Sequence, residues 1–476
     1  MKKLIEDILA RNASIKRRII ATKSGEINIL FVGQLTNRTN LAEYVIRPLQ
    51  RFVQKGGKRI NTRTLTKYIF EIDDMKVKTN PGEIENDVLS GSSVVILPKS
   101  AEYVAINTKE VEHKSIDSPQ ISYTLRGPKD SFTESMDVNL SLIRYRIKDS
   151  RLKTREFKVG QRTRTNVAMF YLDDVASDEC VNEIAEKLGE IDVDGIIESG
   201  ELQQFLVGEK WGLFPKMGII ERSDMACGAI LEGKVVLLVE GSGLALVAPK
   251  TFSEFLTSGD DLYDNKFFGA YSKILRYISI IAMFVLMPAY VAVTSFNTEI
   301  LSADYTITLA SLRARVPFNA LTEALITVFI VELLRESLLR VPKEVGAAIG
   351  MAGGVIIGQS VVSAGILSTL VLIIATLSLL MSFVAPDYTI VNPIRILQVF
   401  LIISAGLFGF FGLAAGLFVV VTKMISTSSF GVPFLAPHAP FLSRDTVKSV
   451  YYSKTDFVDR PSFLNLKDKI RGRKVK

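Results

Sequence analysis

The sequence predicts two structural parts: an α/β N-terminal region of two small subdomains, and then an all-α transmembrane domain that crosses the membrane several times. Apolar residues make up 48% of the 476 residues, and the mean hydropathy is +0.27. These values are high for a soluble protein. The apolar residues concentrate in roughly the last 40% of the chain, whereas the N-terminal part alternates strand-like and helix-like patterns.

The net charge of +7 has two interpretations, a nucleic-acid-binding protein or a membrane protein with cytosolic Lys and Arg. Aromatic residues are not interleaved with the basic ones, as a surface that stacks on bases requires. The charged, amphipathic N-terminus lacks the apolar core of a signal peptide. We therefore expect a membrane rather than nucleic acid as partner, and an N-terminal region in the cytosol.

Residues 1–114 are predicted to form the first α/β subdomain. Leu and Ile recur at helical spacing over 4–20, which predicts a helix there. Alternation over 26–32 predicts a half-buried strand, and the apolar runs 94–97 and 103–106 predict two more strands.

Residues 115–160 are predicted to be a basic linker or interface segment, because Pro, Gly, Lys and Arg become frequent. Two roles stay open for this segment. One is a solvated or inter-domain surface, and the other is a binding site for phosphate or lipid headgroups.

The second α/β subdomain is predicted over 161–265. A strand is expected over 167–172, followed by a helix that Ser177 caps. The glycine-punctuated stretch 227–249 predicts a meander of three strands.

A transmembrane helical domain is predicted over 266–430, with a cytosolic tail over 431–476. A helix needs about 20 apolar residues to cross the hydrocarbon core. The glycine-rich segment 345–361 is shorter, and we expect it to be re-entrant or a short span. If both chain ends are cytosolic, the number of crossings is even, and four is favoured over five. The expected spans are about 276–298, 317–339, 366–384 and 396–422.

Charged residues inside the apolar helix 317–339 form the first candidate site. Charge on a helix in lipid is costly and usually faces a bundle interior or water. Glu323 lies nine residues before Glu332, which places the two on opposite faces of a helix. Glu323 is either a buried structural group or a pore carboxylate, and the later charges are either a headgroup-layer cluster of intrahelical ion pairs or part of a gate. The pore or gating candidates are Asn319, Glu323, Thr327, Glu332, Arg335 and Glu336.

Recurring glycines in two apolar runs form the second candidate site. A stripe of small residues lets helix backbones approach closely. Helix packing is the favoured role for the first stripe, and a pore lining is the alternative. The candidate packing positions are Gly346, Gly350, Gly354, Gly358, Gly412 and Gly416.

The sequence contains no pattern typical of an enzyme. His113 and His438 are far apart, and GSGLAL lacks the third glycine of a dinucleotide-binding loop. Cys180 and Cys227 have no metal-ligand spacing and are expected to be free thiols. We expect no catalytic residue, no metal site and no cofactor.

Six segments, spread over nearly the whole chain, are distinctive when taken together, although no single one is specific. They are 127–144, 160–176, 231–241, 315–342, 349–366 and 434–441. Together they resemble the A subunits of the GerA-type spore germinant receptors, which are also similar to a membrane protein of the stage V sporulation group. Ser223 departs from the resemblance, because proline is expected at this position, in what we expect to be a loop.

The resemblance implies a place in the spore inner membrane and a complex with a transporter-like B subunit and a lipoprotein C subunit. It also implies a homo-oligomer that conducts monovalent cations when a nutrient binds to the B subunit. The first hypothesis is therefore a ligand-gated ion-conducting subunit, in which the helix 317–340 lines or gates the path. The alternative is a non-conducting scaffold. A secondary transporter is less supported, because no internal inverted repeat is visible.

Overall fold

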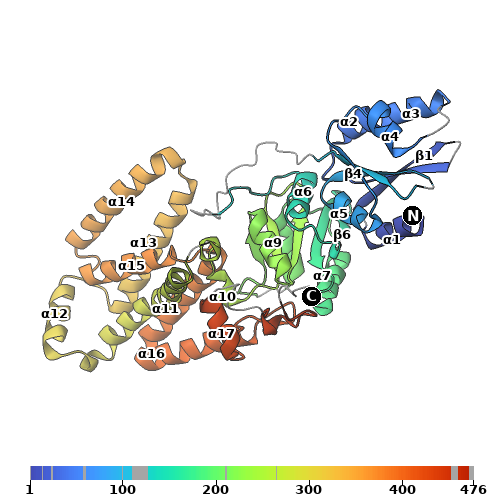
Figure 1. The fold of residues 1–476 in the computed structure, drawn as a ribbon. Helices are drawn as coiled ribbons and strands as arrows, with labels where there is room; N and C mark the ends of the chain where they lie inside the picture. Colours follow the sequence, from blue (N-terminus) through green and yellow to red (C-terminus); the bar gives the residue numbers. More distant parts are fainter. Residues whose placement is uncertain are drawn as a thin grey trace. The chain divides into compact units, whose positions relative to one another are not determined.

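The computed structural model describes residues 2–12, 14–22, 25–56, 60–98, 100–109, 127–208, 212–263, 265–451 and 459–470. It divides into two compact units (Figure 1). The first comprises Met1–Glu209, Met217–Pro249 and Phe457–Lys476, and the second comprises Lys210–Lys216 and Lys250–Asp456.

The first unit begins with an antiparallel sheet in the order β1-β2-β4-β5-β3. Helices cover both faces of this sheet, with α2, α3 and α4 on one face and α1 and α5 on the other (Figure 1). Alternating side chains of β4 explain the two layers: Val94 and Ile96 pack with α1 and α5, whereas Val95 packs with Leu49 of α3. The strands are β1 (Ile15–Thr22), β2 (Gly25–Val32), β3 (Met75–Lys78), β4 (Ser92–Ile96) and β5 (Tyr103–Asn107).

The helices of this first sheet are short, and two of them continue as single π-helical turns. They are α1 (Lys2–Arg11), α2 (Arg38–Asn40), α3 (Arg47–Gln54), α4 (Thr62–Thr64), α5 (Ile84–Leu89), the π-helical turns η1 (Leu41–Ile46) and η2 (Leu65–Ile69), and the 3₁₀ turn η3 (Pro81–Glu83).

A second antiparallel sheet repeats the topology of the first, in the order β6-β7-β9-β10-β8. Each sheet is preceded by a helix and places its first, second, fourth, fifth and third strands side by side. The elements are α6 (Met136–Arg146), β6 (Leu152–Val159), β7 (Thr165–Leu172), α7 (Asp178–Glu190), α8 (Ser199–Val207), β8 (Gly218–Ile220), α9 (Ser223–Leu231), β9 (Val235–Val239) and β10 (Ala245–Ala248).

The strands expected over 26–32, 94–97, 103–106 and 167–172 are confirmed as β2, β4, β5 and β7. Two local predictions are wrong. Residues 4–20 are not one helix, because β1 begins at Ile15 and pairs with β2. The meander over 227–249 has two strands instead of three, because CGAIL belongs to α9, whose Ala226 and Ile230 are buried.

The predicted basic linker, 115–160, is mostly part of the second sheet layer. Its residues 115–126 lie outside the described residues. The rest includes α6 and β6, and β6 pairs with β7 from Leu152 to Val159.

The second unit is mostly helical, with one small antiparallel sheet of β11 (Ser428–Ser429) and β12 (Val432–Pro433). Two of its helices, Lys266–Ser295 and Tyr388–Ser426, are long and apolar enough to cross a membrane. The glycine-rich segment predicted over 345–361 is a continuous helix of 21 residues, and the turn expected near Gly365 separates it from the next helix. The helices are α10 (Phe252–Phe255), α11 (Lys266–Ser295), α12 (Ala303–Arg313), α13 (Ala320–Arg340), α14 (Lys343–Ser363), α15 (Thr369–Ser382), α16 (Val391–Ser426) and α17 (Ser443–Val450).

Helix α16 is a hairpin of two antiparallel limbs rather than one straight span. Gly409 has φ 63° and ψ −142°, which is not helical. Ser404 Oγ donates to the Gly412 carbonyl at 2.7 Å, although eight residues of straight helix extend about 12 Å. A Cβ on Gly416 would lie 2.6 Å from Leu401 Cδ2. The predicted single span 396–422 therefore includes a reversal of chain direction.

Candidate functional site

The polar side chains of α13 occupy two separate environments in the helical unit. Asn319 begins the helix, since its side chain accepts a hydrogen bond from the Thr322 backbone N–H at 2.8 Å. The Asn319 side chain is exposed, and its hydrogen bond to Thr322 is the one expected of a residue that caps a helix. One polar group then lies around Glu323, and a second lies around Arg335.

Glu323 is fully enclosed within the helical unit, with 0% of its surface exposed. Its Oε1 accepts a hydrogen bond from the Ser368 backbone N–H at 2.6 Å, and its Oε2 lies 3.3 Å from Arg313 Nε. Thr327 donates to the Glu323 carbonyl at 2.7 Å. The carboxylate therefore links α13 to α12 and to the start of α15. A buried carboxylate needs such partners, and this arrangement favours the structural interpretation of Glu323.

Glu332 forms its ion pair with another helix, α16, and not within its own helix as expected. Its carboxylate receives both Nε, at 2.9 Å, and Nη2 of Arg395 on α16. The sequence instead favoured an intrahelical pair with Arg335. Such a two-point contact between guanidinium and carboxylate fixes geometry as well as charge.

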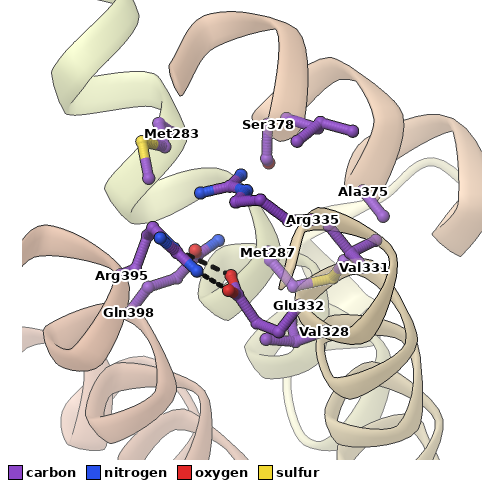
Figure 2. Close-up of a pocket in the computed structure, with 11 residues that line it drawn as sticks. Met283, Met287, Val328, Val331, Glu332, Arg335, Ala375, Ser378, Arg395 and Gln398 are labelled. Carbon is purple, nitrogen blue, oxygen red and sulfur yellow. Dashed lines mark hydrogen bonds and ion pairs between the residues drawn. The ribbon is translucent and has the colours of Figure 1, made fainter. Parts of the chain in front are cut away.

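Arg335 lies on the wall of a small pocket between four helices (Figure 2). Only 8% of its surface is exposed. Its Nη2 donates to Ser382 Oγ at 3.2 Å, while Nε and Nη1 have no hydrogen-bond partner among the described residues. The pocket volume is about 20 Å³, room for a single water-sized species. A nutrient molecule does not fit in it.

The remaining acidic candidate, Glu336, is exposed and forms a 2.6 Å ion pair with Arg340. This is the intrahelical pair that the four-residue spacing predicts. It contributes little stability, because an exposed pair is screened by water and salt.

The glycine positions differ in how closely they are packed. Gly412 and Gly416 lie between the limbs of α16, and a Cβ on Gly412 would approach the Ser404 carbonyl to 2.0 Å. Gly346, Gly350 and Gly358 have looser neighbours, from 3.1 Å upward. A Cβ on Gly354 would meet nothing within 4 Å. That part of α14 is therefore open in a single copy of the chain.

Sequence reasoning missed the partners of the α13 charges. Arg313 lies between the expected spans 276–298 and 317–339, and Arg395 lies just before the expected last span. A signal was present for Arg395: a charge at the edge of an apolar run needs a partner or the membrane surface.

Comparison with known proteins assigns the chain to a family. The family model described as Bacillus/Clostridium GerA spore germination protein matches residues 2–463. The chain belongs to this GerA family. The resemblance seen in the sequence is thus confirmed over almost the whole chain.

Three relatives match this chain over most of its length and most of their own. Spore germination protein B1 of Bacillus subtilis is 34% identical over 446 residues, covering 94% of this chain and 92% of that protein. Spore germination protein KA of the same organism is 30% identical over 484 residues, covering 98% and 89%. An uncharacterized membrane protein, YfkQ, is 30% identical over 424 residues, covering 89% and 82%.

One solved structure is similar to part of the chain. It is the N-terminal domain of the A subunit of the Bacillus megaterium spore germinant receptor GerK3, with 25% identity and a TM-score of 0.41. The match covers 53% of this chain and 94% of that chain.

The departure from the GerA resemblance at Ser223 has a structural explanation. It is not in a loop, as expected, but is the first residue of α9. Proline is tolerated at this helix position, so serine and proline are both compatible with the fold. Here the hydroxyl donates to Asp130 Oδ2 at 2.6 Å and accepts from Arg146 Nε at 3.1 Å.

Proposed function

We propose that this chain is the A subunit of a nutrient receptor in the spore inner membrane, and that several copies form an ion-conducting path that opens during germination. Family membership over residues 2–463 carries this proposal. Two of the relatives are named spore germination proteins, and a third is named a membrane protein. The partners proposed are a transporter-like B subunit, which binds the nutrient, and a lipoprotein C subunit. Monovalent cations are the proposed permeating ions.

The α16 hairpin supports a six-pass membrane domain in place of the four passes expected from sequence. Val391 and Met424, near the two ends of α16, pack with Ile280 in the first half of α11. The tip lies at the other end of α11, where the Phe410 backbone N–H donates to Asn297 Oδ1 at 3.2 Å. Each limb therefore follows α11 over a depth of about 25 Å, most of the hydrocarbon core.

The other three helices alternate in direction over the same depth. Ala320 at the start of α13 packs with Val291 of α11, whereas Glu332 near its end meets Arg395. Helix α14 returns, because Gly365 after it lies against the Arg315 carbonyl. Helix α15 then runs back from the Glu323 contact to the Arg335 contact. With α11 and two limbs of α16, the proposal counts six crossings and keeps both chain ends on the cytosolic side.

The proposed conducting path involves α14, because exposed apolar residues on this helix lie beside a glycine whose side is open. Val355 and Ile356 are more than half exposed, and Gly354 has no neighbour. A second copy of the chain can approach such a surface closely. Glu323 contributes by holding α12, α13 and α15 together, rather than by facing ions. A role in gating stays part of this proposal for the other polar residues of α13, which are Asn319, Thr327, Glu332, Arg335 and Glu336.

Ion flux from liposomes tests the proposal. The chain is reconstituted with its B and C subunits, and monovalent cation release is measured with and without nutrient. We expect cation flux that depends on nutrient. Gly354→Leu should reduce this flux by about tenfold or more, because the larger side chain blocks the close approach of a second helix backbone. The matched control is Ile278→Leu, which changes an exposed apolar residue on α11, outside the proposed α14 surface.

The alternative function is a non-conducting scaffold whose α/β subdomains bind partners. Under this alternative, the complete receptor releases no cations when nutrient is added, although the complex assembles. That result would contradict the conducting role and leave the membrane helices as an anchor.

A further inference from the structure

We propose that the pocket beside Arg335 is a binding site for a small monatomic anion of the chloride class. The pocket lies between α11, α13, α15 and α16, and its polar walls carry Glu332, Arg335, Ser378, Arg395 and Gln398 (Figure 2). All of the residues that line this site belong to one copy of the chain.

The charges around the pocket do not balance. Glu332 is the single carboxylate of the lining, and Arg395 holds both of its oxygens. Arg335 lines the same pocket, and none of the described acidic residues pairs with it. One carboxylate and two guanidinium groups leave one net positive charge. Because Arg335 is buried, its charge requires a counter-charge, since burial of an unpaired charge is strongly unfavourable.

Donors without partners face this pocket. Arg335 Nε and Nη1 and Ser378 Oγ are all buried and lack hydrogen-bond partners among the described residues. Figure 2 shows the Arg335 guanidinium and the Ser378 hydroxyl directed toward the space between α13 and α15. A guanidinium offers N–H donors only, and a hydroxyl can also donate. The set of unused groups therefore suits an acceptor with negative charge.

The size of the pocket selects the class of anion. A volume of about 20 Å³ accepts one water-sized species, so a phosphate or a carboxylate-bearing nutrient is too large. The other walls are apolar, from Met283, Met287 and Ala375 among others. A weakly hydrated halide tolerates such mixed surroundings. Its binding would join four helices at the pocket.

Thermal unfolding of the full-length chain in lipid nanodiscs tests the proposal. Sodium chloride is titrated against sodium gluconate at constant ionic strength, because gluconate is too large for the pocket. We expect a saturable rise in Tm with chloride, of about 3 °C at tenfold excess over the dissociation constant. Bromide should act similarly. Equal Tm values in chloride and gluconate would overturn the proposal and leave the pocket to water.

Variants locate the effect. Arg335→Gln should abolish the chloride dependence, and Arg340→Gln, an exposed position on the same helix, should keep it. Ser378→Ala retains the charge and should weaken chloride binding severalfold, which keeps the test informative if Arg335→Gln fails to fold. If Tm depends on chloride in Ser378→Ala and in Arg335→Gln as it does in the wild type, chloride does not bind at this pocket. Stabilisation that follows anionic lipid rather than chloride would instead assign the positive charge to a headgroup.

Discussion

Replacing Gly409 by alanine should destabilise the helical unit. Among the glycines of α14 and α16 that do not lie between the two limbs of α16, we expect this replacement to have the largest effect. Its φ of 63° and ψ of −142° belong to a region that only glycine adopts readily. The new Cβ would lie 2.8 Å from Asn297 Oδ1 and 2.9 Å from Phe296 Cβ. Both contacts are too short, so backbone or side chains must move.

The magnitude follows from two contributions. Backbone strain of this kind costs about 1–3 kcal/mol, and overpacking costs a similar amount. A total of about 2–6 kcal/mol corresponds to a fall in Tm of about 4–24 °C for a unit of about 200 residues.

The assay is thermal unfolding of the purified chain in detergent, monitored by intrinsic fluorescence. Gly354→Ala is the control, because its Cβ meets nothing and alanine favours a helix by up to about 1 kcal/mol. Gly409→Ala with the stability of the wild type would refute the hairpin, since a straight helix accepts alanine at this position.

Three further predictions concern buried groups. Glu323→Gln should keep the hydrogen bond from the Ser368 backbone N–H at the start of α15 but lose the ion pair with Arg313 of α12. We expect the free energy of unfolding, measured in denaturant melts, to fall by about 1–3 kcal/mol. An unchanged free energy of unfolding would mean that the ion pair is not formed. Burial raises the pKa of both Cys180 and Cys227 to about 12, so neither thiol should react with an aromatic disulfide reagent at pH 8 until the chain is unfolded. Burial alone would raise the pKa of Asp130, but hydrogen bonds from Ser223 and an arginine hold that pKa below its usual range. Ser223→Ala should therefore reduce stability by about 1 kcal/mol near pH 7, and the difference should shrink as pH falls through the folded pKa of Asp130; an equal loss at low pH would contradict this.

The sequence was most informative where one pattern had one structural solution. Apolar runs such as Val94–Ile96 became strands buried on both faces, as their composition predicts. The CGAIL stretch was ambiguous, because a short apolar run fits a strand or a buried helix equally well. The two sheets have the same strand order, but the sequence did not show this, because the same topology can form from different residues.

The candidate site was predictable in its residues but not in its pairs. The positions of Glu323 and Glu332 on opposite faces of α13 follow from helix geometry, and the structure gives them different partners. Those partners lie on other helices: Arg313 ends the preceding helix α12, and Arg395 lies 63 residues after Glu332 on α16. The reversal at Gly409 was hidden for another reason: glycine fits both a tightly packed straight helix and a turn.

The most direct test of a six-pass membrane domain is cysteine labelling from each side of oriented vesicles. Asn392, Phe408 and Lys423 are exposed positions at the start, tip and end of the α16 hairpin. Each is changed to cysteine in turn, with the two buried native thiols as a silent background. The six-pass arrangement predicts that Asn392→Cys and Lys423→Cys react from the cytosolic side and Phe408→Cys from the opposite side. Reaction of Asn392→Cys and Lys423→Cys from opposite sides would contradict it and restore a single straight span.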